Sequence, residues 1–214
     1  MSAHPRVVRL LQDTGFYRII EISWLQLDWL LLTALIDRWR PETHTFHLPI
    51  GEATIMLQDV EILYGLPVDG LVVALPQGMR DYMRAQYLET LQRLTSFRPK
   101  DEAVLVGASC ISLTPIRQYL EAMHDDIAYD TPEVHINQYT RLLLLLMFGG
   151  VLFPNTPGNL INLRFLYHLE QLDDLPQYSW GVIVLGYLYR QMCWACMGTQ
   201  RDVVGFMSLL QVKT

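Results

Sequence analysis

The chain has 214 residues, of which 51% are hydrophobic and 18% are charged, and its formal net charge is −6 at pH 7. This length suits one domain with a sizeable core, and the low charged fraction, against roughly one quarter in ordinary globular proteins, leaves apolar surface for a partner. The negative charge argues against a dedicated nucleic-acid-binding domain, which carries a basic footprint.

The number of cysteines and the length of the apolar runs indicate the cellular compartment of the protein. Three cysteines are too few for a disulfide scaffold, so we expect a reducing intracellular environment. Residues 1–13 lack the apolar core of a signal peptide. The most apolar run, residues 142–148, is far shorter than the ~20 residues that span a bilayer. We therefore expect a buried helix there and no membrane association.

Helices are predicted at the N-terminal end, followed by a hairpin. A short helix over 7–12 and an apolar segment over 16–22 precede a longer helix that begins at Asp28, a suitable N-cap. Pro41 prevents its continuation. Strands are predicted over 45–48 and 53–56, on either side of the turn Pro49-Ile50-Gly51.

A helix over 57–64 follows the hairpin and is expected to stop at Gly65. Met56 stands at its N-cap and cannot accept an amide hydrogen bond, which typically costs ~1 kcal/mol. Further helices are predicted over 79–94, 114–123, 133–149, 160–169, 179–194 and 202–210, with a loop over 96–113. The predicted fold class is mainly α, a single multi-helix globular domain with a small β-hairpin near residues 45–56.

Three residue patterns suggest enzyme or metal chemistry, and each has a simpler structural interpretation. A pyridoxal enzyme needs a lysine in a pocket, but Lys100 lies in a polar loop and Lys213 at the terminus. His44 and His47 resemble zinc ligands, although strand alternation places them on opposite faces. The C-x-x-C pattern ending at Cys196 lies near a helix end and is best explained as two small buried thiols.

A basic and aromatic face is the remaining candidate for nucleic-acid contact. Arg80, Arg84 and Arg93 lie near Tyr82 and Tyr87 in the sequence, and such a combination suits single-stranded nucleic acid. Core tyrosines with solvated arginines explain the same pattern, and the negative net charge favours that explanation. The segment is equally a candidate for docking a protein.

The residues WRPETHTFHLPIGE at 39–52, followed by LQDV, ILYGLPVDG, FGGVLFP and YSWG, resemble the plant mobile domain. This family, also labelled aminotransferase-like, occurs in plant transposable elements and in maintenance-of-meristems proteins. The resemblance extends from about Leu10 to the end of the chain. The family usually has threonine where Met56 stands, and it continues past Gln211 into a tryptophan-rich segment. The resemblance therefore implies a plant mobile domain over residues 1–214 that is truncated at its C-terminus.

The resemblance implies a nuclear protein, or otherwise a cytoplasmic one, that serves meristem organisation, genome integrity and silencing of transposons and genes beside a phosphatase-like partner. It supplies no catalytic, cofactor-binding or metal-binding residues. We expect a non-enzymatic protein-interaction module without a cofactor; the alternative is a transposon-derived DNA-associated module, which the net charge does not support. The candidate partner-binding residues are Trp39, His44, Phe46, Tyr82, Tyr87 and Trp180.

Overall fold

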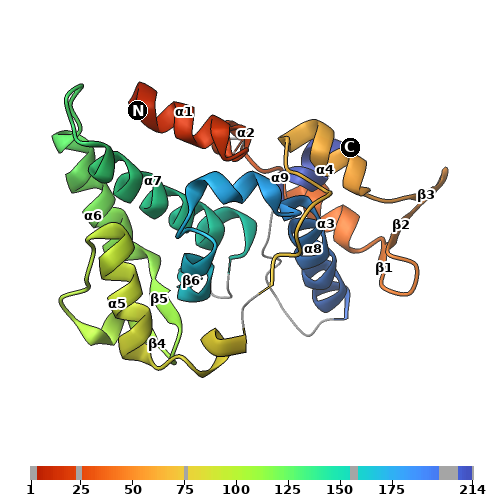
Figure 1. The fold of residues 1–214 in the computed structure, drawn as a ribbon. Helices are drawn as coiled ribbons and strands as arrows, with labels where there is room; N and C mark the ends of the chain where they lie inside the picture. The colour runs from red at the N-terminus through yellow and green to blue at the C-terminus, as the bar shows by residue number, and fades with distance from the viewer. Residues whose placement is uncertain (1–3, 23–25, 75–76, 155–158, 198–206, 214) are drawn as a thin grey trace.

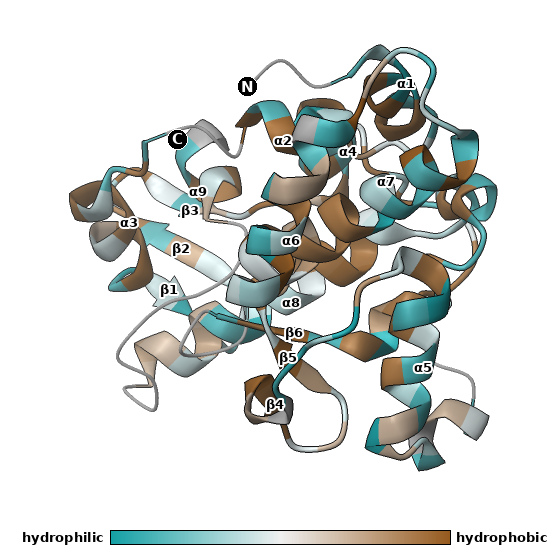
Figure 2. Cartoon of the chain, turned by 90° about the vertical axis from the view of Figure 1, so that its left-hand side faces the viewer, coloured by the Kyte–Doolittle hydropathy of each residue, from teal (hydrophilic) through white to brown (hydrophobic). Residues whose placement is uncertain are grey.

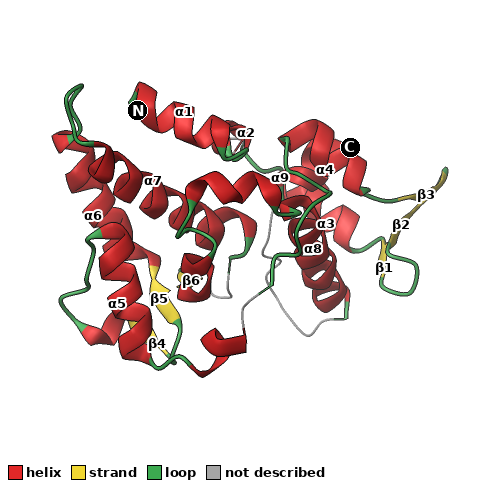
Figure 3. Cartoon of the chain, in the orientation of Figure 1, coloured by secondary structure: helices red, strands yellow, loops and turns green. Residues whose placement is uncertain are grey.

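The computed structural model describes residues 4–22, 26–74, 77–154, 159–197 and 207–213. Helices account for most of this part of the chain, and two small sheets lie at separate places on the helical body (Figures 1 and 3). Each sheet has three antiparallel strands, in the orders β1-β2-β3 and β4-β5-β6. The predicted mainly α class is confirmed, and the second sheet was not predicted.

The two predicted N-terminal helices form, and the apolar segment over 16–22 adds a third. The Asp28 side chain caps α3, where its Oδ1 accepts hydrogen bonds from the backbone N–H groups of Leu30 and Leu31 at 3.1 Å each. This satisfies two of the donors that a helix start leaves free. The helices are α1 (Pro5–Asp13), α2 (Tyr17–Ile22) and α3 (Trp29–Ile36).

The predicted hairpin is present, with a tighter turn than expected. Its strands are β1 (Trp39–Arg40), β2 (Thr45–Leu48) and β3 (Gly51–Ala53). Because Leu48 pairs with Gly51, only Pro49 and Ile50 form the turn, and the last strand begins two residues before the predicted position 53. The hairpin projects from the helical body at the right of Figure 1.

The helix α4 (Leu57–Tyr64) begins and ends for the expected reasons. The Met56 side chain makes no capping bond, while the Asp59 carboxylate accepts from the Met56 N–H at 2.8 Å. Half of a capping box is therefore kept. Gly65 ends the helix at φ +69°, in the left-handed region that glycine adopts without strain.

The region predicted as a loop over 96–113 contains two strands, so that prediction was wrong. Ile111 in the second of them pairs with Ile161, which lies in a segment predicted to be helical. The helix prediction over 160–169 was also wrong, since a strand and a 3₁₀ helix occupy it. The elements are η1 (Gln77–Asp81), α5 (Arg84–Thr95), η2 (Glu102–Val104), β4 (Leu105–Val106), β5 (Cys110–Ser112), α6 (Leu113–Asp126), β6 (Leu160–Asn162) and η4 (Leu163–Tyr167).

The core is centred on α7 and α8. The rings of Phe16, Phe148 and Trp180 meet in it with centroids 5.1 to 5.4 Å apart. The remaining elements are α7 (Glu133–Met147), the π-helical turn η3 (Phe148–Leu152), η5 (Leu172–Gln177), α8 (Trp180–Cys196) and α9 (Ser208–Lys213). The predicted last helix over 202–210 lies partly outside the described residues. Within those residues, no helix is both long and apolar enough to cross a membrane.

Apolar residues are not confined to the core. Figure 2 shows that α3 carries apolar residues at the edge of the molecule, where the side chains of Trp29 and Leu30 are 60% and 86% exposed. This agrees with the low charged fraction of the chain. Apolar surface of this kind commonly marks a contact with another molecule.

Replacing two glycines of α8 with alanine tests how tightly its first turn is packed. Gly181 lies in that turn, and Gly186 serves as the control. A Cβ at residue 181 would lie 2.9 Å from Val68 Cγ1 and 3.1 Å from the Pro67 carbonyl oxygen, whereas one at residue 186 would meet nothing within 4 Å. Gly181→Ala is expected to lower the unfolding free energy by about 1–3 kcal/mol, and Gly186→Ala to leave it unchanged or raise it by up to about 1 kcal/mol. Urea unfolding followed by circular dichroism measures both, and equal midpoints would contradict this packing.

Candidate partner-binding surface

Trp39 fixes the hairpin to the C-terminal half of α8. Its side chain is fully buried, with its ring centroid 5.0 Å from that of Phe46 and 5.1 Å from that of Tyr189. The indole N–H donates to Cys193 Sγ at 3.3 Å. A large buried aromatic side chain is a strong anchor, so the hairpin has a defined position although its far end extends into solvent.

His44 and Thr54 close the base of the hairpin. His44 has φ +53°, and its ring stacks on Tyr189 with centroids 5.3 Å apart and planes 20° apart. Thr54 Oγ1 donates to the His44 carbonyl oxygen at 2.6 Å and lies 2.9 Å from the Tyr189 hydroxyl. The Tyr189 hydroxyl also donates to the Ile55 carbonyl oxygen. Burial raises the pKa of Tyr189, so this hydroxyl stays protonated and able to donate.

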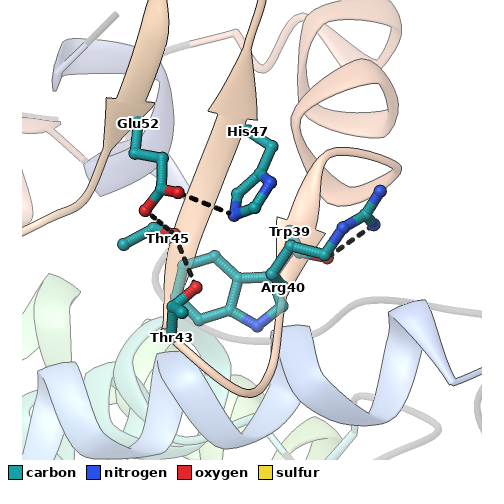
Figure 4. Close-up of polar contacts among 6 residues, drawn as sticks. All are labelled: Trp39, Arg40, Thr43, Thr45, His47 and Glu52. Carbon is teal, nitrogen blue, oxygen red and sulfur yellow. Dashed lines mark hydrogen bonds and ion pairs between the residues drawn. The ribbon is translucent and has the colours of Figure 1, made fainter.

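The outer face of the hairpin carries a polar network, drawn in Figure 4. One oxygen of the Glu52 carboxylate accepts from Thr45 Oγ1 at 3.1 Å, and the other lies 3.3 Å from His47 Nε2. Thr43 Oγ1 and Thr45 Oγ1 are 2.7 Å apart. The His47 and Glu52 side chains are 42% and 55% exposed, and such surface pairs add little stability. The network is therefore open to replacement by a partner's polar groups.

No described strand pairs with the outer edge of β3. The His47 N–H donates to the Arg38 carbonyl oxygen at 2.9 Å, on the side of β2 away from β3. His47 and its partner Glu52 thus form a non-hydrogen-bonded pair, and the main-chain N–H and C=O of Glu52 face outward from the sheet. All three residues of β3 are exposed, and Ile50 at the turn is 96% exposed. Such an edge can accept another strand.

The six predicted partner-binding residues do not form one surface. Trp39, His44 and Phe46 cluster at the hairpin, and of these only His44 is exposed. Tyr87 is buried on α5, where its hydroxyl donates to the Met79 carbonyl oxygen at 2.7 Å, and the half-buried Tyr82 ring lies edge-on to it. Trp180 is fully buried and donates to the Leu175 carbonyl oxygen at 2.8 Å.

The buried residues of this set support the surface from inside. Direct contact with a partner falls to the exposed residues beside them. The hairpin residues that present polar and apolar groups to solvent include Ile50, Glu52 and His47. The turn Pro49-Ile50-Gly51 was the available signal for Ile50, because the tip of a projecting hairpin is exposed. Glu52 and His47 gave no signal in the sequence, since their relevance depends on which strand edge remains open.

The metal and thiol patterns have local explanations. His44 stacks on Tyr189 whereas His47 faces Glu52, and the described residues contain no group of three or more metal-ligating side chains. Cys193 and Cys196 are half-buried and not fully buried as expected, because they lie at the exposed end of α8. Cys196 Sγ donates to the Cys193 carbonyl oxygen at 3.2 Å, and burial raises the pKa of this thiol.

The described residues do not assemble the candidate basic and aromatic face. Arg84 donates from Nε and Nη2 to the Gly107 carbonyl oxygen at 3.3 and 2.9 Å. Arg93 Nη1 lies 2.7 Å from Glu170 Oε1. The Arg80 side chain lies outside the described part of the structure. With Tyr87 buried, the two described arginines and this ring share no common binding surface.

His168 is a buried titratable group in contact with Trp180. Its side chain is 4% exposed, and its ring lies edge-on to those of Tyr178 and Trp180 with centroids 4.9 and 5.5 Å apart. Neither ring nitrogen has a hydrogen-bond partner among the described residues. Burial disfavours the charged imidazolium and lowers the pKa of His168 to about 4.

The burial of His168 predicts that the folded protein loses stability as the pH falls. Because its pKa is about 4 when folded and about 6.5 when unfolded, the unfolded state binds more protons between these values, and stability falls as the pH is lowered through that window. From about pH 7.5 to about pH 5, the wild type should lose about 2 kcal/mol more than His168→Phe. Urea unfolding at both pH values measures the difference. His135→Phe, at an exposed position, should behave as the wild type, and equal losses in all three proteins would contradict the prediction.

Comparison with known proteins finds similar sequences in a plant. Over 208 residues the chain is 38% identical to the "Serine/threonine-protein phosphatase 7 long form homolog" of Arabidopsis thaliana, covering 97% of this chain and 15% of that protein. It is 30% identical over 205 residues to "Protein MAINTENANCE OF MERISTEMS" of the same plant, covering 95% and 40%. It is likewise 30% identical over 204 residues to "Protein MAIN-LIKE 1", covering 95% and 38%.

The chain thus spans less than half the length of each of these relatives. No solved structure matches it. The family model described as the plant mobile domain matches residues 15–214. The chain therefore belongs to the plant mobile domain family.

Proposed function

We propose that this chain is a non-catalytic protein-interaction module of the plant nucleus. It acts beside a phosphatase-like protein in meristem organisation, genome integrity and the silencing of transposons and genes. The observation that carries the interaction role is the open edge of β3 on a hairpin that projects from the body and is anchored by Trp39. A partner strand adds to this edge, and its side chains contact Ile50 and the Glu52 network.

The geometry favours strand addition at β3 over contact through the buried aromatic residues. The outward N–H and C=O of Glu52 offer a matched donor and acceptor, and each main-chain hydrogen bond gained contributes roughly 1 kcal/mol net. Ile50, at 96% exposure, supplies apolar area at the end of the same strand pair. Binding of this type needs little rearrangement, because Trp39 already holds the hairpin in place.

The names of the relatives support the choice of partner and process. One relative is named as a serine/threonine-protein phosphatase homologue, and the matched segment covers 15% of it. A segment similar to this chain therefore occurs in a protein named for phosphatase activity. Another relative is named for the maintenance of meristems. These names motivate a scaffold that works with a phosphatase-like protein and does not itself catalyse the reaction.

The placement of Lys100 also supports a non-catalytic role. Of Lys100 and Lys213, it is the lysine whose side chain the structure describes. It is exposed in the loop after α5, whereas a Schiff-base lysine is held in a pocket. The DNA-associated alternative is supported less well, because the net charge is −6 and Arg84 and Arg93 are engaged within the fold.

The edge-strand role is tested by one position with two substitutions. Glu52→Pro removes the outward N–H while the hydrogen bonds between β2 and β3 remain, because proline is tolerated on an edge strand. It should weaken binding to the purified Arabidopsis thaliana phosphatase homologue by about tenfold or more, as expected for one or two lost main-chain bonds. Glu52→Ala keeps the N–H and controls for the carboxylate. Biolayer interferometry measures both, and equal affinities of the two variants would sink the proposal.

The nuclear assignment is tested separately. A fluorescent fusion of this chain, expressed in plant cells, should accumulate in the nucleus. The free fluorescent protein, which distributes through nucleus and cytoplasm, serves as the control. The same distribution for both would show that this chain does not direct itself to the nucleus.

A further inference from the structure

A second strand-like segment crosses the start of α8. Leu71 forms an isolated parallel bridge with Tyr178, in which the Leu71 N–H donates to the Gln177 carbonyl oxygen at 2.7 Å and the Ser179 N–H donates to the Leu71 carbonyl oxygen at 2.9 Å. Gly70 permits this approach, because it has φ +124° and a Cβ there would lie 2.3 Å from the Gln177 carbonyl oxygen. The segment is thus held firmly against the helix start.

No described residue pairs with the other side of this segment. Both main-chain polar groups of Leu71 face residues 177–179, and in an extended segment the groups of the next residue face the opposite way. Val72, Val73 and Ala74 make no main-chain hydrogen bond with another described residue. The Leu71 and Val72 side chains are 55% and 77% exposed. Apolar side chains and an unpaired main-chain edge therefore coincide here.

Two partly exposed tyrosines pack on the buried His168 next to this bridge. Tyr178 is the bridge partner of Leu71 and is half-buried, and Tyr167 is 39% exposed. Both rings lie edge-on to the buried His168, at centroid distances of 4.9 and 5.2 Å. We call the set Leu71, Val72, Tyr167 and Tyr178 the junction surface. Its tyrosines are held in place by the core beneath them.

The two segments that meet at the bridge carry charge of one sign. Residues 65–74 and 170–186 contain four carboxylates and no lysine or arginine. Glu170 is neutralised by Arg93 at 2.7 Å, whereas Asp69, Asp173 and Asp174 are exposed. Asp174 Oδ1 accepts from Gln177 Nε2 at 3.0 Å, which places it next to the bridge. An apolar strip with a free main-chain edge therefore lies beside exposed carboxylates, among them those of Asp69 and Asp174.

We propose that the junction surface binds an extended segment of a partner protein in which basic and apolar residues alternate. The main chain of that segment pairs with Val72, its apolar side chains cover Leu71, Val72 and the two tyrosines, and its basic side chains face the carboxylates. This is the strand-addition mode, in which alternate side chains give specificity. The junction surface is distinct from the edge of β3 and does not depend on it.

The probe is the fluorescently labelled peptide KVKLKVK, measured by fluorescence anisotropy against the full chain. It should bind, and raising the salt from about 50 to about 500 mM should weaken binding, because exposed charges are screened. The acidic counterpart EVELEVE should not bind. The all-lysine heptapeptide should bind more weakly than KVKLKVK because it lacks apolar side chains. Equal binding of KVKLKVK and either of the other two peptides overturns the proposal.

Variants locate the site. Val72→Ser should weaken KVKLKVK binding about 3- to 10-fold through lost apolar contact, while Val134→Ser, at a 62% exposed valine on the first turn of α7, should not. Asp173→Asn combined with Asp174→Asn should also weaken it about 3- to 10-fold. Unchanged affinity in Val72→Ser or in the double variant overturns the proposal. Glu52→Pro should bind the peptide as the wild type does, which separates this surface from the hairpin.

Discussion

The burial of the Trp180 indole at the start of α8 is the interaction on which the rest of the structure depends. Its ring packs against Phe16 from the N-terminal region and Phe148 from the π-helical turn η3, and its N–H donates to the Leu175 carbonyl oxygen. Segments far apart in the sequence are thereby held around one helix. Because Trp180 is fully buried, the direction of α8 is set by the core and not by solvent-exposed contacts.

The two surfaces assigned to partners lie at opposite ends of this helix. The junction surface is fixed where α8 begins, through the Leu71–Tyr178 bridge, and the hairpin is fixed near its end, through Trp39 and Cys193. A 17-residue helix is about 25 Å long. The surfaces are thus rigidly spaced yet too far apart to be one site. At each, a short extended segment is anchored on one side and leaves its main chain open on the other.

The aromatic composition explains why the partner-binding residues predicted from sequence were placed mainly inside. Burying a large aromatic side chain removes more apolar area from water than burying most other residues, so Trp39, Tyr87 and Trp180 pack in the interior. Trp29 and Trp194 remain 60% and 42% exposed. The sequence shows how many aromatic residues the chain has, but the competition for the core decides which of them face a partner.

The sequence by itself determined the local features of this protein. The Asp28 cap, the turn at Pro49 and Ile50, the stop at Gly65 and the apolar helix α7 follow from short-range patterns. Only the tertiary structure decided the second sheet, where Ile111 pairs with a residue 50 positions away, the open edges of β3 and Val72, and the burial of His168. Hydrogen bonds between distant segments leave no periodic signal, and exposure depends on everything that packs around a residue.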